Sequence, residues 1–304
     1  MEYVLKTNNL SKHYKQFKAL DGLTMSVPKG AIYGFVGKNG AGKTTLIRLI
    51  CGLQQPTSGE YQLYGVKCTN KEIFNSRKRI GAVVETPSIY LDMTAEENLK
   101  YQYRILGMSS FDGLQELLKL VGLENTGKKK AKNFSLGMRQ RLGIAVALCG
   151  NPDFLVLDEP INGLDPHGII EIRELILKLN HEKQITVLIS SHILDELSRI
   201  ATHYGFIDRG HIVREMSAQE LEAACRKSVR MIVTDTKALA RVLDSKSIEY
   251  KILDDSTADV YAKPNFSQLA AALAEENCEV ISMEEYNESL EGFYMSLVGG
   301  DDYE

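Results

Sequence analysis

The sequence predicts a large α/β domain over residues 1–216 and a small α+β domain over residues 217–304. Two continuous apolar strands, 32–36 and 153–157, are typical of a buried and largely parallel sheet. Residues 1–216 carry 28 Lys and Arg against 22 Asp and Glu, whereas residues 217–304 carry 8 against 18. This change in net charge indicates a domain boundary near residue 217.

The composition is that of a globular protein, with 44% hydrophobic and 25% charged residues among 304. No apolar run approaches the roughly 18 residues of a membrane span, and no secretory signal opens the chain. The five cysteines and six histidines show no metal-ligand spacing, so we expect reduced thiols in a cytosolic protein.

The most specific motif is residues 37–45, which fit the phosphate-binding pattern G-x-x-x-x-G-K-[ST]. Its glycines allow a backbone whose N–H groups all point at an anion. In this pattern Lys43 reaches the β- and γ-phosphates, and the Thr44 hydroxyl holds Mg²⁺. We therefore predict that the whole loop binds the phosphates of ATP: Gly37, Lys38, Asn39, Gly40, Ala41, Gly42, Lys43, Thr44 and Thr45.

The surroundings of this loop support a phosphate site. A buried strand, 32–36, runs into the loop, and a buried helix, 45–51, runs out and stops at Gly52. The positive end of that helix dipole favours a bound anion. The alternative is a glycine-rich turn without a ligand.

Two further strands end in polar side chains. The strand 153–157 ends at Asp158 and Glu159, and the strand 185–189 is followed by His192. Ligands of open α/β sheets bind beyond such strand ends. We expect Asp158 to hold Mg²⁺ and Glu159 to polarise the attacking water as general base. A salt-bridged surface pair and a structural histidine are the alternatives.

Three other positions carry weaker signals. Tyr14 lies 29 residues before Lys43, and we expect it to stack on adenine, unless it is a half-buried strand tyrosine. Ser135 and Gly137 lie where a helix predicted over 142–148 opens. Free backbone N–H groups at such a helix start can bind an anion. The alternative is that Ser135 is an ordinary cap.

Residues 217–304 show a βαββαβ order with an added helix, typical of a small α+β sandwich. The predicted strands are 229–233, 250–253, 260–262 and 280–282, and the predicted helices are 237–243, 266–274 and 289–297. This acidic segment has no glycine-rich loop. We expect a regulatory or interaction domain, or a purely stabilising extension.

In this order, the motifs of residues 1–215 resemble the ATP-binding subunits of ABC transporters. The phosphate loop, the Ser135 segment, the 158–159 carboxylates, the Leu164-Asp165 turn and His192 carry the resemblance. It implies a P-loop NTPase fold with a mixed sheet and a helical subdomain. It also implies ATP hydrolysis coupled to transport, with His192 on the γ-phosphate.

The resemblance further implies a head-to-tail dimer, in which each ATP lies between one copy's loop 37–45 and the other's 135–137. Asp165 would then communicate across the dimer. Because the chain has one phosphate loop, the second copy is another chain. Because it has no membrane span, a permease partner would hold it on the cytoplasmic face of the cell membrane.

Two positions depart from the usual family pattern. Leu136 replaces the first glycine of Leu-Ser-Gly-Gly-Gln, and Glu85 stands where glutamine is usual, near Mg²⁺ or the lytic water. Both departures resemble the bacitracin and lantibiotic resistance branch, where an extra C-terminal domain also occurs. That branch implies export or removal of a peptide antibiotic.

Other readings remain open. The cargo could be a lipid, a polysaccharide or an ion, because specificity lies in the permease. Leu136 and Glu85 could mark a degenerate regulatory subunit, although Glu159 and His192 argue against it. A soluble ABC-type ATPase acting on nucleic acid or ribosomes is a further alternative. The lysines at 128–130 read as a solvated face, so we expect no nucleic-acid partner.

Overall fold

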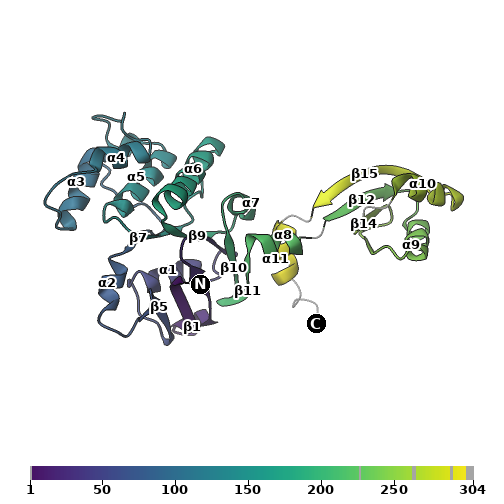
Figure 1. Cartoon of the computed structure of the whole chain (residues 1–304), viewed down its shortest axis with the longest axis horizontal. Coiled ribbons are helices and arrows are strands. Elements are labelled where there is room, and N and C mark those ends of the chain that lie inside the picture. Colours follow the sequence, from purple (N-terminus) through teal and green to yellow (C-terminus); the bar gives the residue numbers. More distant parts are fainter. Residues whose placement is uncertain (1, 226, 262–264, 288–289, 299–304) are drawn as a thin grey trace. The chain divides into compact units, whose positions relative to one another are not determined.

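The computed structural model describes residues 2–225, 227–261, 265–287 and 290–298. The chain divides into two compact units, Met1–Ala218 and Gln219–Glu304, here called the N-terminal and C-terminal units (Figure 1). In the described residues, no helix is both long enough and apolar enough to cross a membrane.

The central sheet of the N-terminal unit has the strand order β11-β10-β4-β9-β8-β7 among the described residues. All its pairs are parallel except β10–β11. Three strands, β4, β8 and β9, are buried along their whole length, as the continuous apolar sequences of β4 and β8 predict. The strands are β4 (Ile32–Val36), β7 (Ile80–Val83), β8 (Phe154–Asp158), β9 (Thr186–Ser191), β10 (His203–Asp208) and β11 (His211–Ser217).

An antiparallel sheet of the order β2-β1-β5-β6, with β3 beside β1, forms a second layer of this unit in the described residues. The helix α1 (Lys43–Ile50) contributes Leu46, Ile47, Leu49 and Ile50 to a core that both sheets share. Burial of this apolar surface fixes the helix behind its loop. The strands are β1 (Tyr3–Tyr14), β2 (Phe17–Leu23), β3 (Ser26–Pro28), β5 (Ser58–Leu63) and β6 (Val66–Lys67).

The remaining helices of the N-terminal unit include a helical group, α3 to α6, at one end of the unit (Figure 1). Within it, α3 packs on α4 and α5, and α5 packs on α6. A capping box opens α3, because Thr94 accepts from the Glu97 N–H and Glu97 accepts from the Thr94 N–H. The helices are α2 (Ile73–Arg77), α3 (Ala95–Ile105), α4 (Leu114–Leu120), α5 (Leu136–Leu148), α6 (Pro166–Lys183) and α7 (Leu194–Ser198); α8 (Ala218–Ala224) crosses the division between the units.

The helix predicted over 142–148 begins earlier than expected, at Leu136. Ser135 caps it, since its hydroxyl accepts from the Met138 N–H at 3.2 Å. The prediction started the helix too late because polar residues 139–141 broke its apolar pattern. Gly137 consequently lies in the first turn of α5.

The C-terminal unit folds as a four-stranded antiparallel sheet in its described residues, with the order β13-β14-β12-β15. The helices α9 and α10 pack on one of its faces around Met231, Leu239 and Leu273. This is the predicted βαββαβ order with an added helix. Its elements are β12 (Lys227–Val233), α9 (Thr236–Ser245), β13 (Tyr250–Ile252), β14 (Thr257–Val260), α10 (Phe266–Glu275), β15 (Val280–Asn287) and α11 (Leu290–Val298).

The strand predicted over 260–262 lies earlier, at Thr257–Val260, where it pairs with β12 and β13. Residue 262 of that prediction and residue 289 of the predicted last helix lie outside the described residues.

Candidate ATP-binding and hydrolysis site

The phosphate loop leaves the end of β4 and enters α1. Its start is tied to β9, because the Gly37 N–H donates to the Ser191 carbonyl at 3.3 Å. Gly42 has φ +114°, and a Cβ there would lie 2.5 Å from the Ala19 carbonyl oxygen. No side chain fits at this position, so the loop requires glycine just before Lys43.

Lys43 lies inside this loop with only 6% of its surface exposed. Its ammonium donates to the carbonyls of Gly37 at 2.6 Å and Lys38 at 3.2 Å. It also lies 3.2 Å from Glu159 Oε1. The loop therefore wraps around a buried positive charge, which is the arrangement needed to hold phosphate.

Asp158 ends β8 directly beside the loop. Thr44 Oγ1 donates to its Oδ2 at 2.8 Å, and Ser190 Oγ donates to its Oδ1 at 2.5 Å. The carboxylate is buried, and its two oxygens are fixed by hydroxyls from two different elements. A threonine hydroxyl and one carboxylate are ligands that Mg²⁺ accepts together with substrate phosphates. The residues present thus fit a magnesium ion.

Glu159 lies between two groups that the sequence placed in the same site. His192 Nδ1 is 2.7 Å from its Oε2, and the Lys43 ammonium approaches its Oε1. The backbone of Glu159 has φ +48°, a left-handed conformation uncommon for this residue type. The structure therefore brings Lys43, Glu159 and His192 together.

A cavity of about 230 Å³ opens between the loop and the carboxylate. Its lining joins residues of the loop to Glu159, so a phosphate held by the loop would face that carboxylate. The lining residues are Phe17, Ala19, Asn39, Gly40, Gly42, Lys43, Thr44, Thr45 and Glu159.

The aromatic residue on this cavity is Phe17, which the sequence analysis missed. Tyr14 pairs with Phe17 across the β1–β2 hairpin, but the residues found to line the cavity include only Phe17. The Tyr14 hydroxyl donates to the Gln54 side chain, and the Lys12 ammonium lies 5.3 Å from its ring. Phe17 is 59% exposed, so its ring is accessible to a planar group that could stack on it. The signal available in the sequence was a second aromatic residue three positions after Tyr14.

Glu85 and the start of α5 lie apart from this cavity. The Glu85 carboxylate is ion-paired through Oε1 with Arg48 of α1 at 2.5 Å, and Glu85 is absent from the cavity lining in the described residues. Ser135 and Gly137 are absent from the cavity lining in the described part of the chain, and Ser135 is exposed. Asp165 caps α6, accepting from the Gly168 N–H at 2.8 Å.

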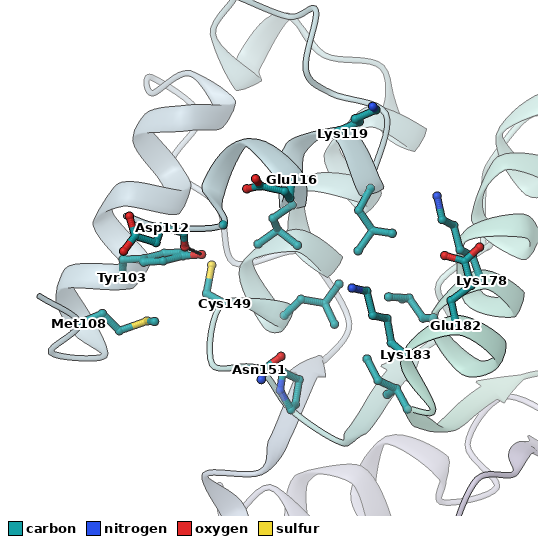
Figure 2. Close-up of a pocket in the computed structure, with 17 residues that line it drawn as sticks. Tyr103, Met108, Asp112, Glu116, Lys119, Cys149, Asn151, Lys178, Glu182 and Lys183 are labelled. Carbon is teal, nitrogen blue, oxygen red and sulfur yellow. Dashed lines mark hydrogen bonds between the residues drawn. The ribbon is translucent and has the colours of Figure 1, made fainter. Parts of the chain in front are cut away.

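A larger cavity, of about 650 Å³, lies among the helices and contains none of the predicted site residues. Figure 2 shows Lys178, Glu182 and Lys183 of α6 on one side, with Tyr103 and Cys149 across from them. Burial raises the pKa of the Cys149 thiol to about 12, and does the same for Cys51 behind the phosphate loop. These thiols therefore stay protonated and do not act as nucleophiles at neutral pH.

Comparison with known proteins adds to this geometry. Residues 20–162 match the family described as ABC transporter. BcrA of Enterococcus faecalis, a bacitracin transport ATP-binding protein, is 39% identical over 99% of this chain and 98% of its own length. The chain belongs to the ABC transporter ATP-binding proteins. It is therefore an ATPase, as the motifs predicted.

Two further similar proteins are also ATP-binding proteins of this family. SrtF of Streptococcus pyogenes, a lantibiotic transport ATP-binding protein, is 42% identical over 70% of this chain and 90% of its own. Among solved structures, a dimeric ATP-binding cassette, MJ0796, bound to ADP and Pi, superposes with a TM-score of 0.62. It is 28% identical and covers 70% of this chain and 98% of its own. The predicted P-loop ABC ATPase fold and the resemblance to the bacitracin and lantibiotic branch are confirmed.

The first prediction concerns the adenine contact. Replacing Phe17 by Ala should raise the Kd for ATP on the order of tenfold, because base–aromatic stacking contributes about 1–3 kcal/mol. Titration calorimetry in the presence of a metal chelator measures binding without turnover. Phe74→Ala, which removes a similarly exposed ring on α2, should leave the Kd unchanged. If the Kd for ATP is normal in Phe17→Ala and raised in Tyr14→Ala, Tyr14 and not Phe17 stacks on the adenine.

Proposed function

We propose that this ATPase drives a transporter that exports a peptide antibiotic of the bacitracin or lantibiotic type, or removes it from the membrane. The observation that carries the proposal is the likeness to BcrA, which extends over 99% of this chain and so includes the C-terminal unit. A likeness confined to the ATPase domain would favour no cargo, because that domain is shared by transporters of many substrates. Lipid, polysaccharide or ion cargo is therefore the second candidate.

We further propose that Lys43 and His192 contact the γ-phosphate while Glu159 accepts a proton from the attacking water. All three side chains meet at the loop, and Glu159 is 19% exposed, which leaves it accessible to a water molecule. Thr44 and Asp158 would hold Mg²⁺, which when bound supplies positive charge to the β- and γ-phosphate oxygens. Glu85, which is ion-paired through Oε1 with Arg48, would approach the metal or the water with its other carboxylate oxygen.

The active assembly that we propose is a head-to-tail dimer. Each ATP would lie between the loop of one copy and Ser135 and Gly137 of the other, and Asp165 would communicate between the two sites. Ser135 is exposed at the N-terminus of α5, where helix N–H groups favour an anion. The dimeric state of the similar cassette MJ0796 supports a dimer of this chain.

A membrane-spanning permease is the second partner, and it would hold the chain at the inner face of the cell membrane. Its docking surface is proposed to lie around α3, where large apolar side chains are exposed. An apolar patch of this kind marks an interaction site on a soluble protein. The exposed residues are Tyr90, Leu91, Tyr101, Ile105, Leu106, Met108 and Phe111. The acidic domain of residues 217–304 would serve regulation or interaction, and no nucleic acid is required.

Glu159→Gln tests the hydrolysis chemistry and the cargo together. The carboxamide keeps the shape of the side chain but cannot accept the proton, so turnover should fall on the order of 10²–10⁴-fold while ATP still binds. Cells whose native copy carries this substitution should become more sensitive to bacitracin or a lantibiotic.

The turnover measurement and the antibiotic-sensitivity measurement can each contradict one part of the proposal. Near-normal turnover would remove Glu159 as the base. Lost turnover with unchanged sensitivity to both antibiotic types would remove the peptide cargo and favour a lipid, polysaccharide or ion.

Affinity capture from native membranes tests the permease partner. The native chain should retain a multi-span membrane protein, and Ile105→Glu should weaken its retention because a charge would enter the apolar contact. Leu53→Glu is the matched control, since Leu53 is similarly exposed and lies outside the α3 surface. Recovery of ribosomes or DNA instead of a membrane protein would contradict the transporter assignment.

A further inference from the structure

Ser190 lies at the point where the strands of the two main motifs meet. Its strand, β9, is paired on one side with β4, which leads into the phosphate loop, and on the other with β8, which delivers the carboxylates. Ser190 is in register with Phe35 on β4 and with Asp158 on β8. The side chain is completely buried. A polar group in this position must find its partners within the protein.

The Ser190 hydroxyl makes two hydrogen bonds of opposite sense, one to each acidic residue. It donates to Asp158 Oδ1 at 2.5 Å and accepts from the Glu159 N–H at 3.0 Å. A hydroxyl has one proton to donate and lone pairs to accept with, so this uses its capacity on two adjacent residues. Alanine or valine in the same strand position offers neither contact.

The contact with Asp158 completes the fixation of that carboxylate. Thr44 holds Oδ2 from the helix side, and Ser190 holds Oδ1 from the sheet side. Hydrogen bonds at both oxygens restrict rotation of the carboxylate plane. Groups that orient a metal-binding carboxylate in this way affect metal affinity and activity, typically about 10–100-fold on mutation.

The contact with Glu159 restrains an unfavourable backbone. With φ +48°, Glu159 occupies a region that residues with a Cβ seldom adopt. Its N–H is shared between Ser190 Oγ and the Ser190 carbonyl at 3.2 Å. This conformation directs the Glu159 side chain to Lys43 and His192.

We propose that Ser190 is a positioning residue for ATP hydrolysis, which aligns the magnesium-binding and base carboxylates with a single hydroxyl. This inference rests on the roles proposed above for Asp158 and Glu159. Ser190 transfers no proton and contacts no phosphate. Its loss therefore acts on the chemical step and on the magnesium requirement, and leaves nucleotide affinity in place.

The test uses the full chain with Ser190→Ala, Ser190→Cys and Ser190→Thr, assayed for ATP turnover over a range of Mg²⁺ concentrations. For the Ala and Cys variants, kcat should fall about 10–100-fold and the half-maximal Mg²⁺ concentration should rise on the order of tenfold. The KM for ATP should change less than about threefold, because the loop is untouched. Ser190→Thr keeps the hydroxyl and should recover most of kcat.

Thr7→Val is the matched control. Thr7 is another buried hydroxyl with one donated and one accepted hydrogen bond, to Leu23 and Met25, on the antiparallel sheet. The Thr7→Val variant should lower the melting temperature as Ser190→Ala does, and it should leave kcat and the Mg²⁺ dependence of turnover unchanged. If Ser190→Ala does not fold, Ser190→Cys, which nearly preserves the volume but donates weakly, decides the question.

Two results would overturn the proposal: kcat and Mg²⁺ dependence within about twofold of native in the folded Ala or Cys variant, or equal losses in Thr7→Val. Glu159→Gln, assayed beside them, separates this failure from that of the proposed mechanism. If ATP turnover is slow in the Glu159→Gln variant and normal in the Ser190→Ala variant, only the positioning role of Ser190 is removed. Normal turnover in Glu159→Gln removes the proposed base itself.

Discussion

The site depends on the parallel pairing of β4, β9 and β8. Because their carboxyl ends meet at one edge of the sheet, three segments far apart in sequence leave it side by side. These segments are the phosphate loop, the Asp158–Glu159 pair and the turn that carries His192. Full burial of the three strands fixes their register, since a shift by one residue would turn every side chain to the other face.

At this edge of the sheet, the charged side chains of the site contact one another directly. Lys43 is buried, but its ammonium is satisfied by two loop carbonyls and by Glu159. Glu159 in turn lies against His192. A buried charge without partners is costly, so each of these side chains also holds the others in place. The same arrangement that stabilises the site prepares it for a phosphate, which competes for the same positive groups.

Residues within one motif could be predicted from the sequence, and residues that act across strands could not. The loop of residues 37–45, the carboxylates Asp158 and Glu159, and His192 each follow a strand with a recognisable local pattern. Ser190 carries no such pattern, because its importance arises from strand register. Its two partners lie more than 30 residues away in the chain.

Three further differences concern a cavity contact, a helix start and an ion pair. Phe17 is distinguished from Tyr14 only by which of the two lines the cavity, and this depends on how the β1–β2 hairpin packs on the loop. The early start of α5 follows from the Ser135 cap, which outweighs the polar residues 139–141. The pair between Glu85 and Arg48 joins α1 to the segment after β7, a contact outside the reach of spacing arguments.

The most direct test of the proposed assembly is sedimentation of Glu159→Gln with and without ATP and Mg²⁺. Slow hydrolysis should let the ATP-bound form accumulate, so the chain should become dimeric only with ATP. Adding Ser135→Arg should keep it monomeric although calorimetry still detects ATP binding, whereas Ser267→Arg, at an exposed serine of α10, should not. Equal dimerisation of the Ser135→Arg variant would contradict a site shared between two copies.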